Sequence, residues 1–262
     1  MATTIGLAGK GGTGKTTFSG LVLKYLLARG MKPVLAVDAD ANTNLNEVLA
    51  LPSETTIGDI RNELLRDMGL VPAGMDKESY IEYRVEEAMT ETPSFDLVAM
   101  GKPEGTGCYC YVNDILKRII SDLSGNYDYI VMDNEAGLEH ISRGLTAAVD
   151  ILFVLSDPSP RGIITAGRVC DMVEEMRLPV KRVAIVLSRV DGEPHPVLME
   201  KISDTGREFA GTFPTDGTVT EFDLQGRSVL ELPDDSPAYR AVEQILDRYV
   251  LSKIAQTGEP AA

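Results

Sequence analysis

The sequence predicts an α/β fold in which a mostly parallel central sheet is covered by helices on both faces. Short runs rich in Val, Ile and Leu alternate with stretches of helical periodicity, and continuous apolar runs of this kind are typical of strands buried on both faces. The chain has 262 residues, of which 44% are hydrophobic and 25% charged. That is enough for one large domain with a well-buried core. We assign residues 1–254 to this domain and expect the tail 255–262 to be frayed.

The apolar runs and the helical spacing define the elements in chain order. Strands are predicted at residues 3–8, 33–38, 95–100, 127–133, 150–157 and 182–188. Residues 16–30 have the spacing of a helix that ends at Gly30. A second helical pattern carries Ile115, Leu116, Ile119, Ile120 and Leu123. Residues 69–94 are acidic, and we expect a helical excursion there before the third strand.

The composition excludes several classes of protein. The net charge is −15 and the pI is near 4.6, so the surface repels nucleic-acid backbones and we expect no nucleic-acid partner. No apolar run approaches the ~18 residues that a membrane span needs. The N-terminus lacks the basic region of a signal peptide, so we expect a cytoplasmic protein that does not bind membranes.

The loop after the first predicted strand, GKGGTGKTT at residues 9–17, carries two overlapping motifs. Gly9, Gly11 and Gly14 match the dinucleotide fingerprint G-x-G-x-x-G, whereas residues 9–16 match the phosphate-binding loop (P-loop) G-x-x-x-x-G-K-[ST]. A dinucleotide site needs neither a lysine nor a hydroxyl. Lys15 neutralises β- and γ-phosphate charge in a P-loop, and Thr16 supplies a hydroxyl to Mg²⁺, so residue chemistry favours the P-loop. The predicted phosphate contacts are Gly11, Gly12, Thr13, Gly14, Lys15, Thr16 and Thr17.

Carboxylates follow two other predicted strands. Asp38 ends the second strand, Asp40 follows it, and Asp133 ends the strand in YIVMDNEAG. The carboxyl ends of parallel strands are where α/β proteins bind ligands, so we expect these side chains beside the phosphates. Asp133 and Asp38 are predicted magnesium residues, and the N–H of Gly137 is expected to approach the γ-phosphate. The structural alternative for either aspartate after the second strand is a helix cap or a turn.

Lys10 is a second lysine in the loop, and KGGTGKTT resembles the deviant Walker A signature of the MinD, ParA and nitrogenase iron protein family of ATPases. The resemblance implies ATP and Mg²⁺ as ligands and a homodimer in which Lys10 reaches the partner's phosphates. It also implies that Asp40 orients the attacking water. The predicted catalytic residues are therefore Lys10, Lys15 and Asp40. The alternative for Lys10 is a solvated loop charge.

Base recognition rests on the same resemblance. The family often carries an Asn at the end of the strand predicted at 182–188, and this chain departs from the pattern with Ser188 and Arg189. The other base-side loop of the family is FPTDG, which makes Pro214 and Asp216 candidates. The expectation of adenine rather than guanine rests on this resemblance and not on a readable guanine-binding motif.

Two of the three cysteines, Cys108 and Cys110, stand one residue apart in GCYCYVND. With MDNEAGLEHISRG and LSDPSPRGI, this stretch resembles the CooC/AcsF-type accessory ATPases of nickel insertion. Two thiolates make half of a tetrahedral site, and a two-fold dimer doubles the number, which suits Zn²⁺ or Ni²⁺. The alternatives are a pair of core cysteines and a strained disulfide. Cys170, alone in a helical pattern, is predicted to pack in the core.

The resemblance implies a dimeric ATPase that assists nickel insertion into a client enzyme, carbon monoxide dehydrogenase or acetyl-CoA synthase. The alternative is a positioning ATPase of the MinD or ParA type that acts on membrane or DNA. Membrane attachment of that type needs a basic amphipathic helix at the C-terminus. Residues 237–262 carry three basic and three acidic side chains, and the net charge of −15 disfavours DNA.

Overall fold

The computed structural model describes residues 2–40, 42–52, 55–66, 71–72, 74–101, 121–122, 125–134 and 148–251. Its centre is an eight-stranded sheet of order β3-β4-β2-β5-β1-β6-β7-β8. Every neighbouring pair is parallel except β3 with β4, which confirms the predicted fold class. The strands are β1 Thr3–Gly9, β2 Val34–Ala39, β3 Thr90–Glu91, β4 Asp96–Ala99, β5 Tyr129–Asn134, β6 Ile151–Ser156, β7 Val183–Ser188 and β8 Glu208–Phe213.

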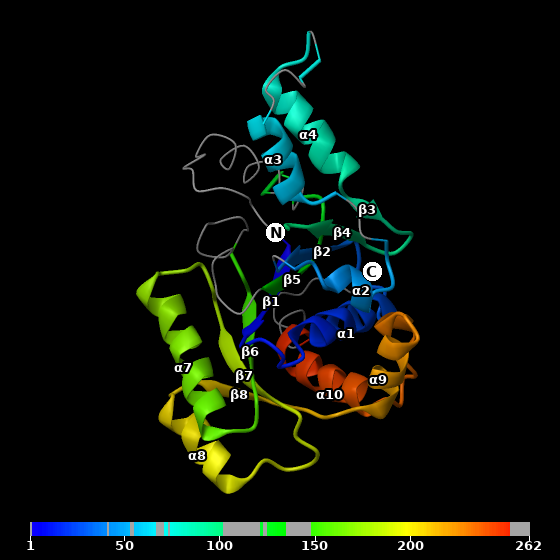
Figure 1. Cartoon of the computed structure of the whole chain (residues 1–262). Coiled ribbons are helices and arrows are strands. Elements are labelled where there is room, and N and C mark those ends of the chain that lie inside the picture. The colour runs from blue at the N-terminus through cyan, green and yellow to red at the C-terminus, as the bar shows by residue number, and fades with distance from the viewer. Residues whose placement is uncertain are drawn as a thin grey trace.

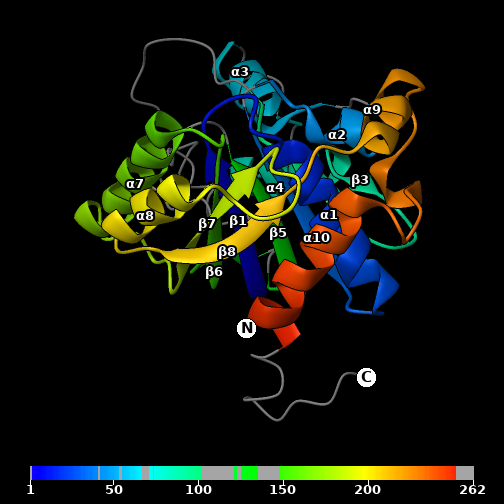
Figure 2. The ribbon, with the colours of Figure 1, turned by 90° about the horizontal axis from the view of Figure 1, so that it is seen from below.

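Helices cover both faces of the sheet. Helices α7 and α8 lie on one side of the strands, and α1, α9 and α10 lie on the other (Figures 1 and 2). None of the helices in the described part of the chain is both long and apolar enough to cross a bilayer. The helices are α1 Lys15–Ala28, α2 Leu45–Val48, α3 Ile57–Arg66, α4 Lys77–Glu87, α7 Pro160–Glu175, α8 Pro196–Asp204, α9 Gly217–Leu224 and α10 Pro237–Leu246, with the short turns η2 Val229–Glu231 and η3 Asp247–Leu251.

The two-sided cover explains why the strands are apolar throughout. Along β2, Leu35 and Val37 pack in the core that includes α3, α4 and α7, whereas Val34 and Ala36 pack in the core with α1 and α10. Alternate residues of a strand point to opposite faces, so a strand covered on both sides has no polar face. The continuous apolar runs in the sequence therefore indicate that helices cover both faces of the sheet.

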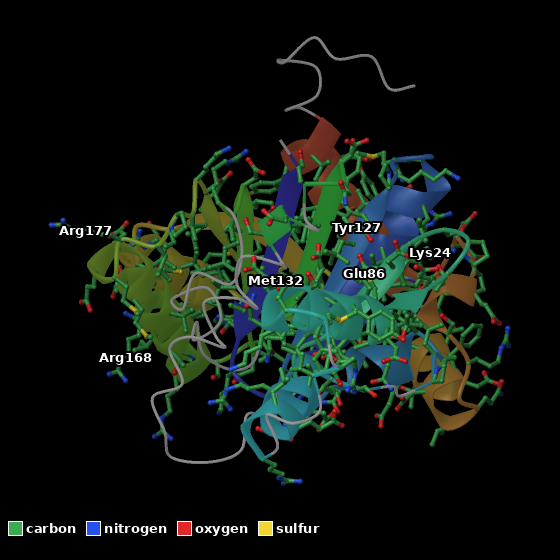
Figure 3. All side chains as sticks on the ribbon, turned by 90° about the horizontal axis from the view of Figure 1, so that it is seen from above. Lys24, Glu86, Tyr127, Met132, Arg168 and Arg177 are labelled. Carbon is green, nitrogen blue, oxygen red and sulfur yellow. The ribbon has the colours of Figure 1, made fainter. Side chains whose placement is uncertain are left out.

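Helix α7 has one buried and one exposed face. Ile163, Cys170 and Val173 are buried against the sheet, which confirms the prediction that Cys170 packs in the core. Arg168, on the opposite face, and Arg177, beyond the end of the helix, extend away from the ribbon (Figure 3). The helical periodicity thus determines which face meets the sheet.

All the predicted strands are present, with small shifts of their ends; for example, the strand predicted at 127–133 is β5, Tyr129–Asn134. The excursion predicted at 69–94 contains α4 but also the short strand β3. Strand β8 was not predicted, because it is partly exposed and Gly211 (φ +148°) interrupts its apolar pattern beside a register shift in β7. The helical pattern at 115–123 lies mostly outside the described residues.

The end of β1 approaches β6 too closely for any side chain. Gly9 has φ +133°, and a Cβ atom there would lie 2.2 Å from the carbonyl oxygen of Leu155. A backbone oxygen in a sheet cannot move aside, and an L-residue resists this φ. The packing of the sheet therefore requires glycine at position 9, as the phosphate-binding motif also does.

Gly9→Ala is expected to lower the free energy of unfolding by about 3 kcal/mol, because it adds a backbone clash to an unfavourable φ. Urea unfolding of the nucleotide-free protein measures the change. Gly11→Ala is the matched control: no atom lies within 4 Å of its added Cβ, and we expect a change within about 0.5 kcal/mol. Equal stability of the two variants would contradict the close approach.

Candidate functional site

The P-loop connects β1 to α1 and leaves the first turn of α1 without a capping side chain. Gly12 (φ +76°) and Gly14 (φ +83°) both take the left-handed conformation, and Gly14 is the N-cap residue. The longer helices with a described N-cap are otherwise capped by side chains, those of Asp76, Ser159, His195, Asp216 and Ser236. The uncapped N–H groups and the positive end of the helix dipole make this terminus an anion site.

The two lysines of the loop occupy different environments. Lys15 is buried, and its Nζ donates to the carbonyl oxygen of Lys10 at 3.2 Å. The hydroxyl of Thr13 donates to the same oxygen at 2.8 Å. The side chain of Lys10 is exposed. Lys15 therefore points back across the loop, whereas Lys10 is accessible to other molecules.

Asp133, near the end of β5, contacts the first turns of α1. Its carboxylate is 1% exposed and accepts a hydrogen bond from the hydroxyl of Ser19 at 3.1 Å. The side chain of Thr16 also hydrogen-bonds this carboxylate, and the charge of Lys15 lies near it. The predicted residues Lys15, Thr16 and Asp133 are thus together. The sequence analysis did not identify Ser19. A serine among the apolar residues of the helix predicted at 16–30 is a signal of a polar partner in the core.

Asp38 lies opposite Asp133, since the two residues are register partners on β2 and β5. Its Oδ1 accepts from the N–H of Asp40 at 3.0 Å, and its Oδ2 accepts from the N–H of Leu45 at 2.8 Å. The buried carboxylate therefore folds the segment that carries Asp40. The turn role weighed as an alternative is present, and it places Asp38 beside the magnesium candidate Asp133.

Asp40 is half-buried at the end of this segment. Its Oδ1 accepts from the backbone N–H of Asn42 at 2.8 Å and from the Asn42 side chain at 3.1 Å. Its Oδ2 has no hydrogen-bond partner in the described part of the chain. The geometry fixes one carboxylate oxygen and leaves the other available to hold a water molecule.

Burial dominates the electrostatics of the two strand-end carboxylates. It raises the pKa of Asp133 to about 6, against the lowering effect of the Thr16 and Ser19 hydrogen bonds and of Lys15. It raises the pKa of Asp38 to about 7, where the N–H groups of Leu45 and Asp40 lower it and the charge of Asp133 raises it. Burial therefore makes the charged forms of both carboxylates costly, and a cation bound between them would offset that cost.

The four candidates for base recognition lie at the ends of β7 and β8. Arg189 (φ +59°) donates from Nη2 to the carbonyl oxygen of Gly12 at 2.6 Å, so this end of β7 adjoins the P-loop. The Ser188 hydroxyl lies 3.8 Å from the Cβ position of Gly14. Both carboxylate oxygens of Asp216 are used within the chain, by Thr218, Ser236 and Ala238. A base contact by these residues or by Pro214 stays a prediction.

The residues at this site fit Mg²⁺ as P-loop proteins hold it. Among the described residues, no group of three or more His, Cys, Asp and Glu side chains is arranged to hold a metal alone. Mg²⁺ usually takes one or two carboxylates and completes its octahedron with water and substrate phosphates. The Thr16 hydroxyl and the buried carboxylates of Asp133 and Asp38 match that requirement. Cys108, Cys110 and Gly137 lie outside the described residues, so the predicted cysteine site and the Gly137 contact stay predictions.

Comparison with known proteins identifies the family. Residues 5–229 match the family described as the CobQ/CobB/MinD/ParA nucleotide binding domain. The chain belongs to this family. It is 39% identical over 251 residues to an uncharacterised ATP-binding protein of Methanocaldococcus jannaschii, covering 95% of this chain and 99% of the relative. The P-loop nucleotide site is thus a family property.

Two further comparisons concern a named relative and the fold. The carbon monoxide dehydrogenase accessory protein CooC of Rhodospirillum rubrum is 25% identical to this member of the family, over 97% of this chain and 98% of CooC. The MinD cell division protein of Aquifex aeolicus has a TM-score of 0.66 at 23% identity, covering 99% of this chain and 98% of MinD. The MinD likeness shows the common fold.

Asp133→Asn is expected to stabilise the nucleotide- and metal-free protein above neutral pH. The raised pKa means that the folded state keeps the proton up to about pH 6, whereas the unfolded chain releases it near 3.8. Stability is therefore lost as pH rises between these values, and the amide removes that loss. We expect a gain of about 3 kcal/mol at pH 8 and roughly half of that at pH 5.

Urea unfolding in EDTA at the two pH values measures this gain. Asp223→Asn, which makes the same charge change at an exposed position, is the control and should alter stability by less than about 0.5 kcal/mol. A pH-independent difference between wild type and Asp133→Asn would show that ionisation of Asp133 does not oppose folding.

Proposed function

We propose that this member of the CobQ/CobB/MinD/ParA family is a dimeric, Mg²⁺-dependent ATPase that assists nickel insertion into carbon monoxide dehydrogenase or acetyl-CoA synthase. The observation that carries the ATPase is the uncapped start of α1, which faces the buried carboxylates of Asp133 and Asp38. The N–H groups of a first turn without a side-chain cap suit phosphate, as does the charge of Lys15, and the carboxylates suit the accompanying cation. ATP, rather than another nucleotide, is supported by the ATP-binding relative.

Each residue has a defined part in the proposed hydrolysis. The P-loop N–H groups and Lys15 bind and orient the phosphates, and Thr16, Asp133 and Asp38 hold Mg²⁺, which neutralises charge on the phosphate oxygens when bound. Asp40 orients the attacking water through its Oδ2, which accepts no hydrogen bond from the described residues. Lys10 supplies positive charge to the partner's phosphates in a homodimer, and its exposed side chain is compatible with that part.

The metal-delivery part of the proposal rests on two supports. CooC, named as an accessory protein of carbon monoxide dehydrogenase, is similar along nearly the whole chain. The sequence also has the pair Cys108 and Cys110, whose thiolates suit Zn²⁺ or Ni²⁺. Two chains give four thiolates around one ion, so metal binding and dimerisation are expected to favour each other. A positioning role on DNA is disfavoured by the net charge of −15.

Lys15→Ala is expected to abolish nucleotide binding, because it removes the cation of the phosphate site. Asp40→Ala is expected to bind ATP normally and to lose at least about 100-fold in hydrolysis, since it removes a water-orienting group and no phosphate contact. Calorimetric titration and phosphate release under single-turnover conditions measure the two properties. Hydrolysis by Asp40→Ala at the wild-type rate would refute its assigned part.

The part of Lys10 in the partner's site is tested by mixing variants. Lys10→Ala should bind ATP but hydrolyse it poorly, and Lys15→Ala should do neither. A heterodimer of the two contains one complete site, built from the phosphate loop of the first subunit and Lys10 of the second. Recovery of part of the activity on mixing is expected, and normal hydrolysis by Lys10→Ala alone would contradict the proposal.

Cys108→Ser and Cys110→Ser are each expected to lose bound metal and metal-driven dimerisation while they retain ATP binding. The wild type should hold one Zn²⁺ or Ni²⁺ per two chains. Elemental analysis and light scattering, with and without ATP, measure the two quantities. Cys170→Ser, at a buried cysteine of α7, is the control and should keep the metal. One tightly bound ion per monomeric chain would be incompatible with a shared site.

A further inference from the structure

Arg189 occupies an unusual backbone position beside the P-loop. It follows β7 with φ +59°, the left-handed region that favours glycine and asparagine. Its guanidinium crosses to the loop and donates from Nη2 to the carbonyl oxygen of Gly12 at 2.6 Å. The contact joins residues 177 positions apart in the sequence.

The ends of β7 and β8 fix this position. The N–H of Arg189 donates to the carbonyl oxygen of Phe213 at 2.6 Å. The Phe213 ring lies against the loop itself, 3.3 Å from the Cβ position of Gly14. A left-handed conformation is unfavourable for an ordinary L-residue, whereas glycine avoids that cost. The backbone geometry therefore favours glycine at this position. The arginine side chain adds a hydrogen bond to the phosphate loop that glycine could not make.

The bond to Gly12 orients a peptide group of the phosphate loop. In a trans peptide the C=O and the following N–H point in opposite directions, so a carbonyl of Gly12 held toward Arg189 turns the N–H of Thr13 to the other side. A phosphate-binding loop needs its N–H groups to converge on the anion, which turns carbonyls outward. The carbonyl of Gly12 is held by Arg189, from outside the loop, whereas that of Lys10 is held within the loop by Thr13 and Lys15.

We propose that Arg189 is a positioning residue of the nucleotide site, which holds the Gly12–Thr13 peptide in the orientation that binds polyphosphate. This inference rests on the proposed function only in requiring that the loop bind phosphates. It replaces the base contact expected for Arg189 with a part that does not depend on the base. The ligand class affected is any polyphosphate, with or without a nucleoside.

Two ligands separate the two parts. Inorganic pyrophosphate has no base, whereas ADP has the same diphosphate with adenosine attached. Arg189→Asn keeps the left-handed backbone at low cost but is too short to reach Gly12. Arg189→Lys keeps the charge and a donor. Calorimetric titration of each variant with both ligands, in Mg²⁺, gives the dissociation constants, and the melting temperature of the nucleotide-free protein reports the fold.

Arg189→Asn is expected to weaken ADP and pyrophosphate by the same factor, about tenfold, as suits the loss of one charged hydrogen bond at an exposed site. Arg189→Lys is expected to recover part of this loss, and the melting temperature of both variants should stay at or above that of the wild type. A purely structural part would lower the melting temperature and would not be restored by lysine.

Weakened ADP binding with unchanged pyrophosphate binding would show a base contact and overturn the inference. Unchanged binding of both ligands would overturn it as well. If the wild type bound neither ligand, the proposed ATPase function itself would fail, and this assignment with it. Arg189→Gly, which removes the left-handed cost altogether, repeats the test if the asparagine variant does not fold.

Discussion

The buried carboxylate of Asp133 against the first turns of α1 is the interaction on which the nucleotide site depends. It ties β5, in the middle of the sheet, to the helix whose N-terminus faces the ligand. A carboxylate this deeply buried is costly unless it is hydrogen-bonded and near positive charge. Thr16, Ser19 and Lys15 supply those conditions in part. A cation bound beside Asp133 would offset the remaining cost of burying its charge.

The site takes its chemistry from both sides of the central strand. The P-loop follows β1, which has β5 on one side and β6 on the other. The carboxylates come from β2 and β5, whereas Ser188 and Arg189 come from the end of β7. An open α/β sheet binds its ligands where the chain changes direction in this way, because the loops on the two sides diverge and leave a crevice. Acidic and basic groups are thus delivered to opposite sides of one phosphate loop.

Asp38 shows how one side chain serves the fold and the site together. Its two oxygens hold the N–H groups of Asp40 and Leu45, so the segment that carries Asp40 is organised around a buried charge. Any change in the ionisation or coordination of Asp38 acts on the same two hydrogen bonds. The position of Asp40 is therefore coupled to the state of Asp38, which is one of the predicted magnesium residues.

The sequence by itself determined the fold class, most of the strands and the residues of the phosphate loop. Apolar runs reveal burial on both faces, and the spacing of Gly14, Lys15 and Thr16 is a local requirement of phosphate binding, so both can be read without knowing what lies nearby. Strand β8 was not predicted because its apolar pattern is interrupted at Gly211.

Only the tertiary structure decided which distant groups meet. The hydrogen bond from Ser19 to Asp133 and that from Arg189 to Gly12 depend on the order of strands in the sheet. The engagement of both Asp216 oxygens, in capping α9 and in the contacts to Ser236 and Ala238, depends on the start of α10 lying beside the start of α9. No local pattern specifies these pairs, because each is fixed by the relative placement of elements far apart in the chain.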